Sequence, residues 1–203
     1  MASKYDLIVI GSGPGGYVAA IRASQLGMKV GVVERAELGG ICLNWGCIPT
    51  KALLKSAQVF EYIEHASDYG VQITGAKADF GAMVKRSRGV ADSMSKGIQF
   101  LFKKNKIDHI KGNGVLSAPK TVEVTDEKGT KTAYLADHII IATGGRSREL
   151  PGMPIDGKKI IGYREAMVLD KQPKHMVIVG SGAIGSEFAY FYNAIGTEVI
   201  LVE

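Results

Sequence analysis

The sequence predicts an α/β protein in which a parallel sheet carries a small antiparallel β segment and is followed by the start of a second sheet of the same kind. Three observations lead to this fold class. A pattern of strand, glycine-rich loop, helix and strand opens the chain and returns over residues 175–203. A helical periodicity of apolar residues covers residues 79–105. Short β runs follow it at 107–110, 114–117, 121–125 and 132–135.

The composition is that of a globular protein. Of 203 residues, 46% are hydrophobic and 22% are charged, which suffices for one large core or two smaller ones. The net charge of +5 is scattered without a long basic run, so we expect no nucleic-acid partner. No apolar stretch reaches the roughly 18 residues that span a bilayer, and the sequence opens without a signal peptide. We therefore expect a cytoplasmic protein without a membrane partner.

The first copy of the repeated pattern runs from residue 5 to Glu34, through the loop Gly11-Ser12-Gly13-Pro14-Gly15-Gly16. This is the dinucleotide-binding fingerprint with its flanking strands and terminal acid. The first glycine makes a tight turn, the second admits a pyrophosphate to the backbone, and the third lets the helix pack closely on the strand. The helix N-terminus attracts phosphate, and the carboxylate accepts hydrogen bonds from ribose hydroxyls.

The second copy repeats this spacing residue for residue. Its loop is Gly180-Ser181-Gly182-Ala183-Ile184-Gly185, and its second strand ends in Glu203. In both copies the acid lies 18 positions after the third glycine. Glu203 favours NAD over NADP, because an arginine near this position would instead suit a 2′-phosphate. Two glycine-rich turns without a ligand are the alternative, which the full context of strand, loop, helix and acid disfavours.

The only two cysteines lie between the two copies, in the segment GGICLNWGCIPTKALL. Pro49 suits the first turn of a helix, so Cys42 and Cys47 lie at or before a helix N-terminus, where a thiolate is stabilised. Two inert cysteines, a zinc site and a redox disulfide are the possible interpretations. Zinc needs about four ligands, and the four histidines show no metal-ligand spacing, so we expect no metal. The redox disulfide is favoured, although inert cysteines stay possible.

The cysteine segment closely resembles the redox-active segment of the pyridine nucleotide–disulfide oxidoreductases, whose usual form is GGTCLNxGCIPSK. Ile41 and Thr50 depart from that form without replacing a cysteine. Within the family, CLN–GCIP followed by KALL looks most like the dihydrolipoamide dehydrogenases. The resemblance covers residues 5–203, including Gly112–Gly114 and the strand IIIATGG, in which Gly145 stands where serine is usual.

The resemblance implies FAD and NAD as cofactors. It places an FAD-binding Rossmann-like domain at 1–150 and the first part of an NAD-binding domain at 151–203. Cys47 would face the flavin, Cys42 would exchange with the substrate, and Lys51 would pair with Glu187 of the second domain; a solvated lysine and a first-turn carboxylate are the plainer interpretations. The implied cofactor-binding residues are Gly11, Gly13, Pro14, Gly15, Gly16, Glu34, Gly40, Lys51, Gly114, Ala142, Thr143, Gly144, Gly180, Gly182, Ile184, Gly185, Glu187 and Glu203.

The resemblance also implies a reaction. Electrons would pass from dihydrolipoamide through a Cys42–Cys47 disulfide and FAD to NAD⁺ in a homodimer. The dihydrolipoamide would be carried by a lipoyl domain of a 2-oxoacid dehydrogenase or glycine cleavage complex. Because the rest of the family's NAD domain and its interface domain do not follow, we expect this chain to be inactive alone or nearly so. Glutathione or mercuric reductases, and a non-catalytic flavin- or nucleotide-binding module, are the alternatives.

Overall fold

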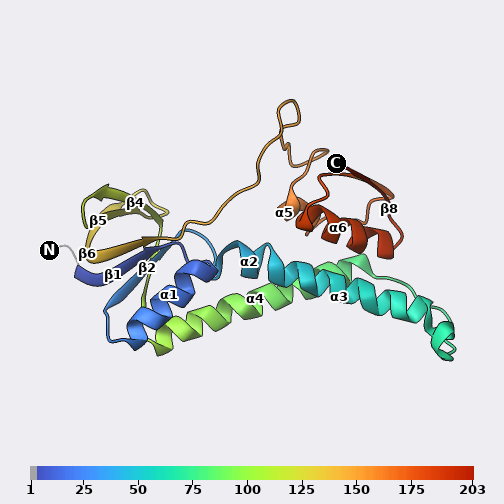
Figure 1. Cartoon of the computed structure of the whole chain (residues 1–203), viewed down its shortest axis with the longest axis horizontal. Helices are drawn as coiled ribbons and strands as arrows, with labels where there is room; N and C mark the ends of the chain where they lie inside the picture. The colour runs from blue at the N-terminus through green and yellow to red at the C-terminus, as the bar shows by residue number, and fades with distance from the viewer. Residues whose placement is uncertain (1–3) are drawn as a thin grey trace. The chain divides into compact units, whose positions relative to one another are not determined.

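The computed structural model describes residues 4–203, and Figure 1 shows its helices and strands. The chain forms two compact units. The first comprises the residues up to Asn44 together with Asp92–Arg146, and the second comprises Trp45–Ala91 and Ser147–Glu203. The domain boundary after residue 150, which comes from the sequence pattern, stays a prediction.

The first unit contains a mixed six-stranded sheet with the strand order β3-β2-β1-β6-β5-β4. Strand β1 pairs in parallel with β2 and β6, and β2 pairs in parallel with β3. Strands β4, β5 and β6 form an antiparallel meander. The strands are β1 (Lys4–Ile10), β2 (Val30–Glu34), β3 (Asp108–Lys111), β4 (Asn113–Ala118), β5 (Thr121–Thr125) and β6 (Lys131–Ile141). The predicted α/β fold with an antiparallel segment is therefore confirmed.

Strand β1 from Leu7 to Ile10 and strand β2 from Val30 to Val33 are continuous apolar runs, because both of their faces are covered. Ile8, Val9 and Val32 are fully buried. Helix α1 (Pro14–Gln25) follows the first glycine loop and buries only small residues, namely Gly16, Ala20 and Ala23. Small residues on this face let the helix axis come close to the sheet. The beginning of α1 is thereby held at the end of β1.

Strand β6 differs from the predicted elements. The sequence predicted a short run at 132–135, and the family resemblance implied a strand over 139–145, whereas β6 is a single strand of 11 residues, Lys131–Ile141. Its first half pairs with β5 and its second half with β1, so one strand serves the meander and the parallel part of the sheet. The polar residues Asp137 and His138 obscured this continuity in the sequence.

The second unit packs helices around an aromatic core. Tyr192 and Phe191 of α6 are almost fully buried, and their rings contact each other and the ring of Phe80. The hydroxyl of Tyr192 donates to the carbonyl of Ala166 over 2.5 Å. The elements are α3 (Cys47–Glu64), η1 (Ala66–Tyr69), the first part of α4 (Phe80–Lys104), α5 (Tyr163–Ala166), β7 (His175–Val179), α6 (Ala183–Ala194) and β8 (Glu198–Val202). Strands β7 and β8 pair in parallel.

The long helix predicted over 79–105 is confirmed as α4. Between residues 4 and 203, no helix combines the length and the apolar character needed to cross a bilayer.

Candidate functional site

The first glycine loop has the close backbone packing that its sequence pattern predicts. Gly11 has a φ of +100°, and a Cβ there would lie 2.2 Å from the carbonyl oxygen of Ala142. A Cβ on Gly16 would lie 1.9 Å from the carbonyl oxygen of Gly11. Only glycine fits either position. Gly13 is the N-cap of α1, and no side chain caps the helix, which leaves its N-terminal dipole available to an anion.

Glu34, at the end of β2, is held by four hydrogen bonds. One carboxylate oxygen accepts from the backbone N–H and the hydroxyl of Ser12 over 2.9 and 2.7 Å. The other accepts from the N–H groups of Arg35 and Ala36 over 2.8 and 2.9 Å. Burial raises the pKa of Glu34, but these hydrogen bonds outweigh it and the pKa lies below its ordinary value. The group is an oriented anion beside the glycine loop.

The lowered pKa of Glu34 predicts a contribution to acid sensitivity. The ionised Glu34 contributes its full stabilisation of the folded state well above pH 4.5, the ordinary pKa of a glutamate. This contribution is lost as the pH falls through the lower pKa that Glu34 has in the folded state. In Glu34→Gln we expect less stability at neutral pH, because the amide leaves donors unpaired, and a flatter decline in acid. Urea unfolding on both sides of pH 4.5 measures this, with the exposed Glu37→Gln as the control. Parallel declines in the wild type and Glu34→Gln would contradict the assignment.

The second glycine loop has the same local geometry as the first. The N–H of Gly180 donates to the carbonyl of Val202 over 2.7 Å, as that of Gly11 donates to Val33 over 2.8 Å. A Cβ on Gly185 would lie 2.0 Å from the carbonyl oxygen of Gly180. Gly182 is the N-cap of α6 and, like Gly13, has no side-chain cap. Both copies of the fingerprint therefore build an open helix N-terminus.

The segment before the first cysteine lies against the first glycine loop. A Cβ on Gly40 would lie 2.6 Å from Cα of Gly13, and the N–H of Gly39 donates to the carbonyl of Ser12 over 3.1 Å. Helix α2 (Gly40–Asn44) starts at this contact and carries Cys42. The predicted nucleotide loop and the first cysteine are thus neighbours within one unit.

The two cysteines are both disulfide-bonded. Because the sequence contains no other cysteine, they form the pair Cys42–Cys47. Cys47 is the first residue of α3, and Trp45–Gly46 separates it from α2, so the two cysteines lie on two different helices. The predicted disulfide between Cys42 and Cys47 is therefore confirmed. Among residues 4–203, no cluster of three or more His, Cys, Asp or Glu side chains could hold a metal.

Lys51 and Glu187 form an ion pair within the second unit. Lys51 lies one turn after Cys47 in α3, and Glu187 lies in the first turns of α6. The Lys51 side chain is 62% exposed and that of Glu187 29% exposed, so the pair stabilises the fold by less than about 1 kcal/mol. The pairing inferred from resemblance is present, while its functional role stays a prediction.

Asn44 is a site residue to which the sequence analysis assigned no role. It is buried, and its amide donates to the carbonyls of Leu38 and Gly40 over 2.9 and 3.0 Å. It thereby fixes the Gly39–Gly40 turn beneath the glycine loop. An asparagine between apolar neighbours in the segment CLNW was the available signal.

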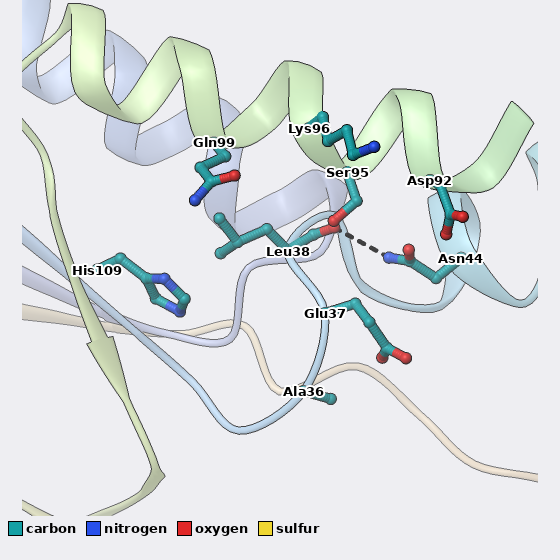
Figure 2. A pocket seen from close by; sticks show the side chains of 9 residues that line it. All are labelled: Ala36, Glu37, Leu38, Asn44, Asp92, Ser95, Lys96, Gln99 and His109. Atoms are coloured by element: carbon teal, nitrogen blue, oxygen red, sulfur yellow. Dashed lines mark hydrogen bonds between the residues drawn. The ribbon is translucent and has the colours of Figure 1, made fainter. Parts of the chain in front are cut away.

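A polar hollow of about 280 Å³ lies beside this turn, and Figure 2 shows its lining. Figure 2 places the ring of His109 on one side and Asp92, Ser95, Lys96 and Gln99 of α4 along the other. Burial lowers the pKa of His109, and nearby Glu34 partly opposes that shift. The hollow could not be predicted from the sequence, because the residues that line it lie in three segments far apart in the chain.

The remaining predicted residues occupy strand ends and loops. Gly114 of β4 faces β2, where a Cβ would lie 3.0 Å from the side chain of Val33. Ala142 follows β6 and its N–H donates to the carbonyl of Ile10 over 2.8 Å. Open or exposed positions are those of Gly15, Gly144, Ile184 and Glu203. Pro14 is at the start of α1, and Thr143 directly precedes Gly144.

Comparison with known proteins identifies a family and several close relatives. The family model described as pyridine nucleotide-disulphide oxidoreductase matches residues 5–203. A dihydrolipoyl dehydrogenase of Rhizobium etli is 52% identical over the whole chain, which covers 45% of that relative. One of Chlorobaculum parvum is 49% identical, with 43% covered, and a leghemoglobin reductase of Vigna unguiculata is 44% identical, with 39% covered. The chain spans less than half the length of these relatives.

Proposed function

This chain belongs to the pyridine nucleotide-disulphide oxidoreductase family. We propose that it contributes to the activity of a dihydrolipoyl dehydrogenase, which oxidises dihydrolipoamide and reduces NAD⁺. The observation that carries the proposal is the disulfide of Cys42 and Cys47, next to a glycine loop built for a dinucleotide. The identity to dihydrolipoyl dehydrogenases over the whole chain supports this substrate among the disulfide reductases.

The residues of the first unit fit the ADP half of FAD. Gly11, Gly13 and Gly16 clear the backbone for a pyrophosphate, α1 offers an N-terminus without a side-chain cap, and Glu34 is an oriented carboxylate for a ribose. All four of its accepting positions are already used by Ser12, Arg35 and Ala36, so a ribose hydroxyl would exchange with one of these donors. FAD, when bound, supplies two-electron transfer between a dithiol and NAD⁺.

The remaining site residues have proposed roles of the same kind. Gly40, Gly114 and the residues 142–144 complete the flavin site. The Gly180–Gly185 loop, with Glu203, binds NAD. Lys51 and Glu187 form an ion pair near the first residues of α3, which would lie beside the flavin. We propose domains at 1–150 and 151–203, a homodimer in the cytoplasm, and a substrate carried by a lipoyl domain of a 2-oxoacid dehydrogenase or glycine cleavage complex.

The protein's own part in the reaction is thiol–disulfide exchange. A substrate thiolate attacks the sulfur of Cys42, the bond between the two protein sulfurs breaks, and Cys47 leaves as a thiolate. The second substrate thiol then attacks the mixed disulfide and releases Cys42 as a thiol. The substrate has become a disulfide, and the protein has gained two electrons. The position of Cys47 at the first residue of α3 favours its thiolate, because the helix dipole stabilises negative charge there.

A single-turnover experiment tests the substrate. We expect dihydrolipoamide to reduce the Cys42–Cys47 disulfide of the FAD-loaded protein at least about tenfold faster than dithiothreitol, a matched dithiol without the lipoyl chain. Glutathione should be slower than both. The appearance of two protein thiols, counted by alkylation and mass spectrometry, gives the rate. Faster reduction by glutathione than by dihydrolipoamide would point instead to a reductase of the glutathione type.

A further inference from the structure

Trp45 occupies an unusual place in the redox segment. It is the only tryptophan of the chain, and it lies three residues after Cys42 and two before Cys47. Helix α2 ends at Asn44 and α3 begins at Cys47, so Trp45 and Gly46 are the whole connection between the two helices. Whatever holds Trp45 therefore restrains the segment between the two sulfurs.

Two arginines hold its ring. The guanidinium carbon of Arg88, in α4, lies 4.1 Å from the ring centroid, and that of Arg164, in α5, lies 5.1 Å from it. Both distances are within the roughly 6 Å range of cation–π attraction. Each arginine is positioned in turn, since Arg88 contacts the sulfur of buried Met167 and Arg164 donates to the hydroxyl of Tyr163. Arg88 and Arg164 are here called the arginine clamp.

The indole N–H takes no part in this arrangement. Trp45 Nε1 is buried, and within the described residues 4–203 it has no hydrogen-bond partner. A buried donor without an acceptor costs free energy. A hydrogen bond from the indole N–H therefore does not explain why a tryptophan occupies this position. The site uses the aromatic ring itself, over which the two guanidinium groups lie.

We propose that Trp45, held by the arginine clamp, is a positioning residue that keeps the segment between the cysteines in one geometry after the disulfide is reduced. This rests on the proposed function, because it concerns the same thiol–disulfide step. In the oxidised protein the covalent bond restrains the segment. In the dithiol form only non-covalent contacts do so, and a held segment gains less conformational entropy when the bond opens. The clamp therefore opposes reduction and speeds re-closure.

The test is the equilibrium between the protein disulfide and dithiothreitol, in which the protein gains two thiols and dithiothreitol becomes a disulfide. We expect Trp45→Leu to raise the equilibrium constant for reduction about tenfold, which is about 30 mV for a two-electron couple. Trp45→Phe removes the unpartnered N–H and makes the ring smaller but keeps an aromatic face, so its constant should stay within about threefold of the wild type. Thiol counting by mass spectrometry gives each constant.

A second pair of variants separates stacking from charge. Arg164→Lys keeps the positive charge but loses the planar guanidinium, so it should shift the constant in the same direction as Trp45→Leu. Arg22→Lys, at an exposed arginine in α1, is the matched control and should leave it unchanged. Because Trp45 is the sole tryptophan, its fluorescence also reports the clamp, and acrylamide quenching should rise in Arg164→Lys. Circular dichroism verifies that each variant is folded.

Two results would overturn the clamp: a constant for Trp45→Leu equal to that of the wild type, or a shift in Trp45→Phe as large as in Trp45→Leu. An unchanged constant in Arg164→Gln, which removes the cation from beside the ring, would also overturn it. FAD binding is measured separately. A wild-type protein that binds no FAD, with the variants still in the expected order, would refute the proposed function and support the clamp.

Discussion

Gly16→Ala is expected to lower the free energy of unfolding by at least about 3 kcal/mol and to abolish FAD binding. The added methyl group would lie 1.9 Å from the carbonyl oxygen of Gly11, a backbone atom that no rotamer change can move. Helix α1 must therefore shift away from β1, and its N-terminus moves with it. Urea denaturation and titration with FAD measure the two effects.

Gly15→Ala is the matched control, because it adds the same methyl group to the neighbouring residue of the same helix. Nothing lies within 4 Å of that position. Alanine is the better helix former, so stability should change by no more than about 1 kcal/mol, in the direction of a gain. Should the two variants lose stability equally, the close approach of Gly16 to Gly11 would not be the cause of the loss, and the account of the loop would be wrong.

Cys47→Ser and Cys42→Ser should produce opposite spectra in the FAD-loaded protein. Neither variant can form the disulfide, so both lose dithiol oxidation completely. If Cys47 faces the flavin, the Cys42→Ser variant keeps the Cys47 thiolate and shows a long-wavelength thiolate–flavin band without any reductant. Cys47→Ser should lack this band at every stage of reduction. Absorbance spectra of the two purified variants, recorded over a pH series, measure the difference.

The two variants also check each other. Both remove one sulfur from the same segment and leave one thiol, so stability and flavin affinity should change alike in the two proteins. Bands of equal strength in both variants, or a band only in Cys47→Ser, would contradict the assigned order of the sulfurs while leaving the disulfide itself unaffected.

The local features of the fold could be predicted because each follows from neighbouring residues. The spacing from Gly11 to Glu34, and again from Gly180 to Glu203, predicted two strand–loop–helix–strand units, and the helix periodicity predicted α4. Apolar runs predicted the buried central strands. These signals depend on periods of two or 3.6 residues and on glycine spacing, which are all visible in one dimension.

Contacts between distant segments could not be predicted in the same way. Strand β6 joins two predicted runs because its two halves meet different partners, and no residue within it announces that pairing. Asn44 is held by the nearby Leu38. Trp45 is held by Arg88 and by Arg164, which lies 119 residues away in the sequence. A cation–π contact leaves no periodic trace, so the arginine clamp emerges only from the structure.

The most direct measurement of the central claim is an anaerobic titration of the FAD-loaded wild-type protein with dihydrolipoamide. We expect the first two electrons to generate two protein thiols and a long-wavelength band, while most of the flavin absorbance persists. Loss of the flavin absorbance before any thiol forms, without such a band, would show that the cysteine pair does not exchange electrons with the cofactor and would contradict the account.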